Sequence, residues 1–425
     1  MVAGIRGQDF AYTNINNAIT ITAYSGPGGN VDIPGSIDGL PVTSLGDWAF
    51  FQNPFFILTN AVTGVAIPNS VTNIGNYAFY DCLNLTNVTI GKGVINIGTE
   101  VFKGCFRLGT IALNPLNTAY SVADGVLFNK NKTALIQYPV GSPTESYTIP
   151  SGVTNIGEYS FFESSLTNVR IPGSVLSIGF EAFGYSANLM NVFISQGVAD
   201  IGAGAFNGCE SLSSVTIPDS ITNIGADAFW DCRLGSVVIP ARVASIGSGA
   251  FYQCFELTNL TILNGVTNIG DSAFYECAGL TSVVIPGSVT KIGRNAFNGC
   301  TSLAAVYFKG NPPDADNTVF DAVGSTVFYL PGTTGWGSTL GGAATVLWNP
   351  LMQTSDGSFG VKMRQFGFNV TGTAGIPLVI EANTNLTSGA AWVSLQNCTL
   401  TNGSIYFSDP HWTNYPSRFY RIRSP

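Results

Sequence analysis

One pattern of hydrophobic and polar positions recurs along most of the chain. A hydrophobic residue is followed by glycine, three variable positions and phenylalanine, as in Ile74, Gly75 and Phe79. The glycines of the ten copies are Gly46, Gly75, Gly98, Gly157, Gly179, Gly202, Gly225, Gly247, Gly270 and Gly293. From Ile156 onward, successive copies are 22 or 23 residues apart. A fixed period of this length is typical of a solenoid, in which each repeat forms one coil.

Each repeat contains two segments that are expected to be extended. The segment Leu85–Ile90 alternates apolar and polar residues and is rich in β-branched ones, which predicts a strand with one buried face. Proline often closes this segment, as at Pro68 and Pro172, because proline cannot donate a hydrogen bond to a neighbouring strand. A second, shorter piece such as Val71–Ile74 leads to the glycine. We expect the glycine either to adopt a positive φ or to pass close to the neighbouring coil.

The residues after the glycine predict a single helical turn. Several copies place a residue there that favours a helix N-terminus, namely Asp47, Asn76, Thr99, Ser248 and Asp271. In seven copies a cysteine follows the phenylalanine by three residues, which puts both side chains on one face of such a turn. These cysteines are Cys82, Cys105, Cys209, Cys232, Cys254, Cys277 and Cys300. We interpret them as small buried hydrophobic residues, since Cys-x-x-Cys pairs and accompanying histidines are absent.

One repeat alone leaves its hydrophobic stripe exposed, whereas stacked copies bury it. The pattern therefore predicts a repeat solenoid of β-strands with short helical turns. We expect an N-terminal β-cap at residues 1–34, repeats at 35–305 and a C-terminal cap at 306–349. Residues 357–425 lack the repeat anchor and alternate in the manner of a small all-β, sandwich-like domain.

The spacing of the repeats breaks once. After Ile97, 59 residues separate this anchor from the next one, in place of two ordinary units. Two apolar runs, Ser121–Phe128 and Thr133–Pro139, flank the polar stretch Asn129–Lys132, which predicts a β-hairpin. We expect an irregular repeat at about 108–150 that carries this hairpin on one edge.

The repeat unit resembles that of a known family. The segment from Leu280 to Cys300, LTSVVIPGSVTKIGRNAFNGC, is similar to the BspA-type leucine-rich repeat of bacterial surface proteins. The resemblance covers roughly residues 30–335. It implies a right-handed, curved leucine-rich-repeat solenoid and a role in adhesion or in the recognition of host or matrix molecules. A shared fold does not by itself identify the ligand.

Composition and charge narrow the class of function. The 425 residues include 17 basic and 25 acidic side chains, so the formal charge is -8 and the basic surface that nucleic acids require is missing. The nearest candidate for a transmembrane segment, 323–348, has few charges but is broken by glycines and a proline, so we expect no transmembrane segment. Residues 1–8 lack the apolar stretch of a secretory signal. The Thr-, Asn-, Ser- and Gly-rich, lysine-poor composition nevertheless indicates an extracellular or cell-surface protein.

We expect binding on the exposed positions of the longer strands. Most of these positions hold small neutral residues, which suit hydrogen bonding to a broad protein or glycan partner. By residue type, the candidate binding residues are Arg170, Phe193, Tyr307, Asn191 and Asn259. An ordinary solvated sheet face is the alternative interpretation of each of them.

The leading hypothesis is therefore a monomeric, non-catalytic binding or adhesion protein, for which we expect no cofactor and no metal site. Two alternatives remain open. One is a structural spacer or surface-layer protein without a specific ligand, and the other is an enzyme with its site in the C-terminal domain. A serine or cysteine triad would need His411, the only histidine. The residues around it, Asp409–Trp412, show no nucleophile signature and predict a turn with an aromatic anchor.

Overall fold

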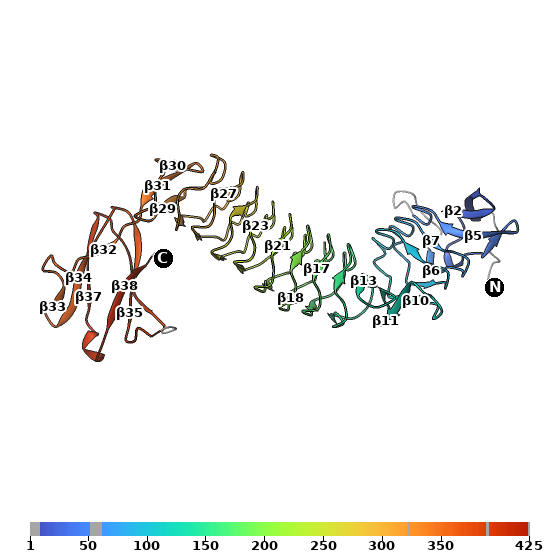
Figure 1. The fold of residues 1–425 in the computed structure, drawn as a ribbon, viewed down its shortest axis with the longest axis horizontal. Helices are drawn as coiled ribbons and strands as arrows, with labels where there is room; N and C mark the ends of the chain where they lie inside the picture. The colour runs from blue at the N-terminus through green and yellow to red at the C-terminus, as the bar shows by residue number, and fades with distance from the viewer. Residues whose placement is uncertain (1–8, 52–61, 322, 388–390, 424–425) are drawn as a thin grey trace.

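The chain forms an elongated β-solenoid that bends along its length and is followed by a β-domain (Figure 1). The structure is a computed structural model and describes residues 9–51, 62–321, 323–387 and 391–423. The first described residues and the C-terminal domain lie at opposite ends of the molecule. The predicted repeat solenoid with a small all-β domain at its C-terminal end is confirmed.

Nearly every coil contributes one strand to what we call the long-strand column. Its neighbouring strands pair in parallel and mostly in register, so that Val169 lies beside Val192. The column breaks after β10 and again after β20. Its strands are β3 (Gly29–Asp32), β6 (Val62–Ala66), β8 (Asn87–Ile90), β10 (Thr110–Leu113), β14 (Ser146–Thr148), β16 (Asn168–Ile171), β18 (Asn191–Ile194), β20 (Ser214–Thr216), β22 (Ser236–Ile239), β24 (Asn259–Ile262), β26 (Ser282–Ile285), β28 (Ala305–Phe308), β29 (Thr326–Tyr329) and β31 (Ala343–Leu347).

The coils also contribute to a second, short-strand column, whose strands lie just before the repeat glycines, except for β13 of the irregular repeat. Its strands are β5 (Leu40–Leu45), β7 (Asn73–Ile74), β9 (Asn96–Ile97), β13 (Ala134–Gln137), β15 (Asn155–Ile156), β17 (Ser177–Ile178), β19 (Asp200–Ile201), β21 (Asn223–Ile224), β23 (Ser245–Ile246), β25 (Asn268–Ile269) and β27 (Lys291–Ile292). At the N-terminal end, β1 (Phe10–Ile15) and β2 (Ala18–Tyr24) form an antiparallel hairpin, and β2 pairs in parallel with β5. Two further short strands, β4 (Ser36–Ile37) and β30 (Thr339–Leu340), pair with β5 and β31.

The repeat phenylalanines form two stacks in the core, one on each side of the irregular repeat. Phe206, Phe229 and Phe251 are fully buried, and the ring centroids of successive members are 5.3 and 5.2 Å apart. These distances approach the spacing of about 4.7–4.9 Å between adjacent strands, because one ring is added per coil. The repeat cysteines are buried beside this stack, as the sequence predicted.

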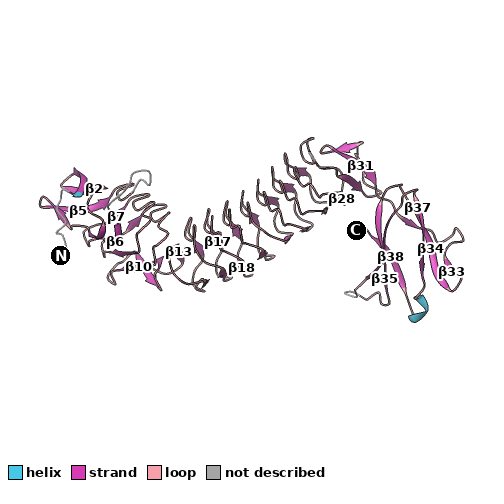
Figure 2. Ribbon diagram, turned by 180° about the vertical axis from the view of Figure 1, so that it is seen from behind, coloured by secondary structure: helices cyan, strands magenta, loops and turns pink. Residues whose placement is uncertain are grey.

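The predicted helical turn after each glycine does not form. The turn segment, by which we mean the seven residues that follow a repeat glycine, contains turns but no helix between residues 62 and 300, and Figure 2 shows cyan only near the two ends of the molecule. In a regular coil Asp227 and Asp231 have φ values of 54° and 56°, which a helix does not allow. The two left-handed residues lie four positions apart, and every second backbone N–H from Asp227 to Asp231 is directed toward the next coil.

These outward N–H groups bond to the next coil. Asp227 N–H donates to the Ser248 carbonyl oxygen at 2.8 Å, and Phe229 N–H donates to that of Ala250 at 2.8 Å. The residues that were expected to cap helices also form hydrogen bonds between neighbouring coils. The Oδ1 atom of Asp271 accepts a hydrogen bond of 2.9 Å from the backbone N–H of Arg294, one coil later. The polar residue after the glycine therefore links two coils instead of starting a helix.

The repeat glycines are required by close approach and not by a positive φ. None of the ten has a φ in the left-handed region. A methyl group added at Gly270 would lie 2.7 Å from the Ser248 backbone nitrogen and 2.8 Å from the Ile246 carbonyl oxygen of the preceding coil. Both neighbours are backbone atoms, which cannot rotate away. The sequence left two reasons open for this glycine, a positive φ and a close approach to the neighbouring coil. The structure supports the close approach.

The irregular repeat contains the predicted hairpin and one further antiparallel strand beside it. Asp124 and Gly125 break the first predicted run, so that β11 (Tyr120–Ala123) and β12 (Val126–Asn129) form one antiparallel hairpin. β12 then forms a second hairpin with β13, and β13 pairs in parallel with β15. The added strands thus start the second part of the short-strand column, and the hydrophobic core divides into two clusters at this point.

The C-terminal domain consists of two antiparallel sheets that pack face to face. One contains β32 (Leu351–Met352), β33 (Gly360–Lys362), β34 (Gln365–Thr371) and β37 (Ser404–Asp409). The other contains β35 (Pro377–Asn383), β36 (Val393–Thr399) and β38 (Phe419–Arg423). Phe368 and Phe407 from the first sheet share a buried cluster with Leu378 and Ile380 from the second. This arrangement confirms the expected sandwich-like domain.

Close approach at the glycines makes a stability prediction. We expect Gly270→Ala to destabilise the protein by about 1–3 kcal/mol, because the added methyl group overpacks a rigid backbone contact. The measurement is the urea midpoint of unfolding. Gly235→Ala is the matched control, since a methyl group there meets no atom within 4 Å, and it should change the midpoint little. Equal midpoints for the two variants would show that the coils do not approach as closely as described.

Candidate functional site

Four of the five predicted binding residues are exposed on the long-strand column, and three of them gather at one place. A hollow of about 380 Å³ lies over β14, β16, β18 and β20. Its lining includes Arg170, Phe193 and Asn191, together with Tyr147 and Asn168. We call this region the sheet hollow. The alternation of the strands explains it, because every second side chain of each strand points away from the core.

Arg170 and Phe193 form the centre of the sheet hollow. They lie opposite each other in the register of β16 and β18. The guanidinium carbon of Arg170 is 4.4 Å from the centroid of the Phe193 ring, a cation–π contact, and the Phe193 side chain remains 46% exposed. At an exposed site such a contact contributes about 0.5–1 kcal/mol. The pair therefore presents an ordered apolar and cationic surface to solvent.

Asn191 lies beside this pair and Asn259 does not. The Nδ2 group of Asn191 donates to Oδ1 of Asn168 at 2.9 Å, which fixes the amide plane of Asn191. Asn259 is exposed on β24, where its Nδ2 group donates to Oγ1 of Thr258 at 3.2 Å. It does not line the hollow. The structure thus brings Arg170, Phe193 and Asn191 together and leaves Asn259 several coils away.

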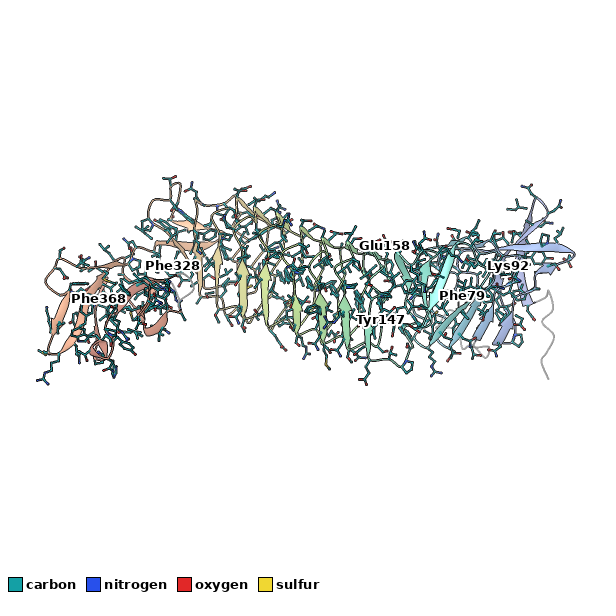
Figure 3. The ribbon with its side chains drawn as sticks, turned by 60° about the horizontal axis from the view of Figure 1, so that its bottom comes forward. Phe79, Lys92, Tyr147, Glu158, Phe328 and Phe368 are labelled. Carbon is teal, nitrogen blue, oxygen red and sulfur yellow. The ribbon has the colours of Figure 1, made fainter. Side chains whose placement is uncertain are left out.

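The prediction that Tyr307 is an exposed anchor is wrong. Tyr307 is only 6% exposed, and its ring stacks on Phe328 at 5.1 Å in a cluster that includes Phe368 of the C-terminal domain. Figure 3 labels Phe328 at the end of the solenoid and Phe368 in the neighbouring domain. Burial raises the pKa of Tyr307 to about 12. The strand register was read correctly, but the sequence did not reveal that the C-terminal domain covers this end of the sheet.

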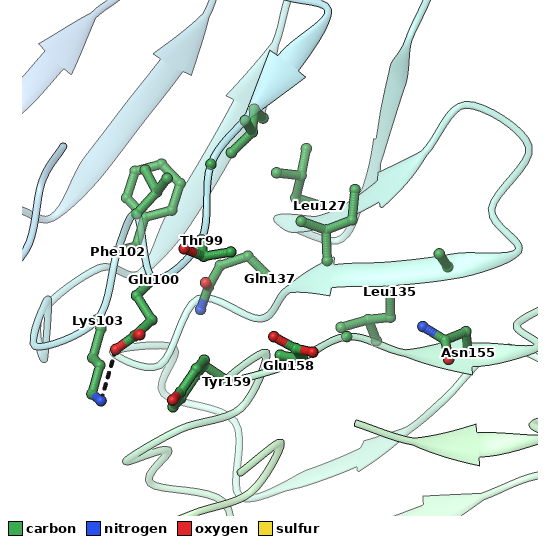
Figure 4. Close-up of a pocket in the computed structure, with 16 residues that line it drawn as sticks. Thr99, Glu100, Phe102, Lys103, Leu127, Leu135, Gln137, Asn155, Glu158 and Tyr159 are labelled. Carbon is green, nitrogen blue, oxygen red and sulfur yellow. Dashed lines mark ion pairs between the residues drawn. The ribbon is translucent and has the colours of Figure 1, made fainter. Parts of the chain in front are cut away.

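A second concave site lies where the stack of coils is interrupted. A cavity of about 270 Å³ opens between the coil of Glu100 and Lys103 and the coil of Glu158 and Tyr159, as Figure 4 shows. We call it the coil slot. The Lys103 ammonium group is 2.8 Å from Oε2 of Glu100, and it lies 4.5 and 4.4 Å from the ring centroids of Tyr159 and Phe162. Lys103 therefore ties the two walls of the slot together.

The surroundings of the coil slot are acidic. Burial raises the pKa values of the carboxyl groups of Asp81, Glu163 and Glu181. Burial alone would lower the pKa of Lys103, but its hydrogen bond to Glu100 and the charge of Glu100 leave that pKa raised. Lys103 is thus charged at neutral pH, and among the described residues it is the only basic one that lines the slot.

Only an indirect signal for the coil slot is present in the sequence. The break in the repeat period marked the region, but Glu100, Lys103 and Tyr159 belong to ordinary-looking turn segments on either side of it. Each turn segment was expected to be helical, so the distance between two of them across the break could not be judged. Charged and aromatic residues at matching positions of the copies that flank an irregular repeat are the signal that was missed.

The remaining candidate chemistry has structural explanations. The thiol of Cys232 donates to the Phe206 carbonyl oxygen at 3.2 Å, and the other repeat cysteines make the same contact. In the C-terminal domain the backbone N–H of His411 donates to Oδ1 of Asp409 at 2.9 Å, and the Trp412 indole donates to the Arg364 carbonyl oxygen at 3.3 Å. This is the expected turn with an aromatic anchor.

No group of His, Cys, Asp and Glu able to hold a metal ion occurs among the described residues. Over the same residues, no helix has the length and apolar character needed to cross a bilayer.

Comparison with known proteins identifies the family to which the repeats are similar. Residues 41–139, 140–254 and 222–334 match the model of the BspA type leucine rich repeat region, with six copies. A leucine-rich repeat protein from Eubacterium ventriosum is similar in structure, with a TM-score of 0.52 and 22% identity over 68% of this chain and 91% of that protein. A leucine rich cell surface protein from Faecalibacterium prausnitzii has 27% identity and a TM-score of 0.48 over 77% and 94%. A search of curated proteins finds no match.

The buried cysteines predict a pH dependence of stability. Burial raises the pKa of the Cys254 thiol from 9.0 to about 12. Above the lower value the unfolded chain has lost a proton that the folded chain retains, so stability falls as the pH rises through this range. We expect Cys254→Ala to make this fall shallower by about 1.4 kcal/mol per pH unit. The measurement is the urea midpoint as a function of pH, and parallel curves for the two chains would contradict the burial of this thiol.

Proposed function

Because the chain belongs to the BspA-type leucine-rich repeat family, we propose that it is a non-catalytic binding or adhesion protein that recognises a protein or glycan with its exposed strand face. The proposal includes a place of action outside the cell or at its surface. Its lysine-poor composition, rich in threonine, asparagine, serine and glycine, supports that location. The family supports binding in general, and the surface of this chain has to supply the particular site.

The observation that carries the proposal is the sheet hollow around Arg170 and Phe193. Elsewhere the exposed strand positions hold mostly small neutral side chains such as Ser236 and Thr261. The hollow combines a planar cation, an exposed aromatic ring and the fixed amides of Asn168 and Asn191. Arginine and aromatic residues carry much of the free energy of binding in protein interfaces, and aromatic rings with neighbouring amides also suit the apolar faces and hydroxyl groups of sugars.

The geometry favours a partner that lies across several coils. Residues of β14, β16, β18 and β20 contribute to the hollow, so a partner that fills it contacts four successive strands. On the C-terminal side, Tyr307 and Phe328 are covered by the C-terminal domain. The free part of the face therefore lies toward the middle of the solenoid, where we place the binding site.

A binding screen with matched variants tests the proposal. The full chain is screened against a glycan array and a panel of immobilised matrix proteins, and every ligand found is titrated against variants. We expect the double variant Arg170→Ala, Phe193→Ala to lose about tenfold or more in affinity, since each residue acts as an anchor. Asn259→Ala is the control, because Asn259 is exposed on the same face but outside the hollow.

Two results would overturn the proposal. Unchanged affinity of the double variant would remove the sheet hollow as the site, even if a ligand is found. The absence of any ligand in both panels would favour a structural spacer over a binding protein.

A further inference from the structure

The coil slot exists because one coil is too short. In a regular coil the isoleucine of the short-strand column precedes the repeat phenylalanine by five positions, as Ile156 precedes Phe161. In the interrupted coil, which runs through β13, Leu135 pairs with Ile156, and the Tyr138 ring stacks on Phe161 at 5.0 Å. Leu135 precedes Tyr138 by three positions, and five minus three leaves two residues missing. The slot is the space where these two residues would lie.

The missing residues leave a backbone group on each wall that has no partner in the part of the chain that the structure describes. In regular coils the residue two places after the glycine donates its N–H to the next coil, as Asp227 does to Ser248 at 2.8 Å. Glu100 occupies this position in the coil that precedes the slot. No described residue accepts a hydrogen bond from its backbone N–H. Across the slot, no described residue donates to the Glu158 carbonyl oxygen, although the equivalent Ala226 carbonyl oxygen accepts from Gly204. Donor and acceptor thus face the same space and match an extended peptide backbone.

The charge of the slot selects the side chain of such a peptide. Of the described residues that line the slot, Glu100 and Glu158 are acidic and Lys103 alone is basic. Glu100 is already paired with Lys103 at 2.8 Å, whereas Glu158 is exposed and forms no ion pair among the described residues. The contact of Lys103 with the Tyr159 ring shows that the aromatic wall accepts an ammonium group. A basic side chain is therefore favoured over an acidic one.

We propose that the coil slot binds a short extended peptide with a lysine or arginine, two residues of which take the place of those missing from the interrupted coil. One peptide carbonyl oxygen accepts from the Glu100 N–H, one peptide N–H donates to the Glu158 carbonyl oxygen, and the basic side chain lies against the Glu158 carboxylate. The volume of about 270 Å³ is at the lower limit of small-ligand sites, as expected for two residues. This site is independent of the sheet hollow, since the two share no lining residue.

The probe is the blocked tripeptide acetyl-Ala-Lys-Ala-amide, with acetyl-Ala-Glu-Ala-amide as its charge-reversed counterpart. Each is titrated to millimolar concentration into the full ¹⁵N-labelled chain, and the backbone amide signals of Glu100 and Asp227 are followed by NMR. We expect the lysine peptide to shift the Glu100 signal and to leave that of Asp227 in place. The glutamate peptide should bind about tenfold more weakly, because Glu158 repels it.

Variants separate a specific site from general attraction to an acidic surface. Glu158→Gln should weaken the lysine peptide about three- to fivefold, the effect of an exposed ion pair, while the exposed Glu210→Gln should not. Ala134→Phe, which fills the slot from β13, should abolish binding while the spectrum of the remaining coils is retained. The Arg170→Ala, Phe193→Ala variant should bind the peptide normally, so that failure of the proposed function and failure of this site are told apart.

Three results would overturn this inference. The first is an unshifted Glu100 signal with the lysine peptide at millimolar concentration. The second is equal binding of the two peptides, and the third is equal weakening by Glu158→Gln and Glu210→Gln.

Discussion

The backbone hydrogen bonds that each turn segment donates to the next coil are the constraint on which the rest of the structure depends. They require residues such as Asp227 and Asp231 to adopt a left-handed conformation, which costs roughly 1–2 kcal/mol per residue for a side chain with a Cβ atom. Three bonds per coil offset this cost by joining neighbouring coils at a fixed distance. The repeat glycine has no side chain because the same distance leaves no room for one.

The side chains that mark the repeat follow from this arrangement. The backbone ladder between coils uses the carbonyl groups before and after the phenylalanine. The carbonyl of the phenylalanine itself accepts a hydrogen bond within its own coil, as Phe206 does from the Cys209 N–H at 3.2 Å, and it takes no part in the ladder. The cysteine of the next coil donates its thiol to that group, as Cys232 does to Phe206. Phenylalanine rings then stack at about the spacing of the coils. The most regular residues of the sequence thus hold the coils together, and the candidate sites are formed by variable strand positions and by the interrupted coil.

The sequence predicted the elements that depend on hydrophobic periodicity. The repeat period, the alternating strands, the inward phenylalanines and cysteines and the separate C-terminal domain all follow from it. The turn segments were wrongly predicted as helical, because Asp47 and Asp271 are of the residue types that cap helices. A capping side chain accepts a hydrogen bond from a backbone N–H, and here the neighbouring coil supplies that group. The position two places after the glycine holds residues as different as Trp48, Glu100 and Gly204, so local propensity could not reveal its left-handed conformation.

The candidate sites were predictable only in part, because they depend on contacts between distant segments. Arg170, Phe193 and Asn191 could be placed on one face from strand register alone. The burial of Tyr307 depends on the packing of the C-terminal domain against the solenoid, which no local pattern encodes. The coil slot depends on a count of residues in the interrupted coil, and this count is meaningful only once Leu135 and Tyr138 have been aligned with the regular coils.

Hydrogen exchange at single backbone amides tests the central claim most directly. The amides of Asp227 and Gly249 donate to the next coil, whereas the amide at the equivalent position in the coil before the interruption, Glu100, has no acceptor among the described residues. We predict slow exchange at Asp227 and Gly249 and fast exchange at Glu100 under native conditions. Fast exchange at Asp227 and Gly249 would contradict the ladder itself, and slow exchange at Glu100 would contradict its interruption.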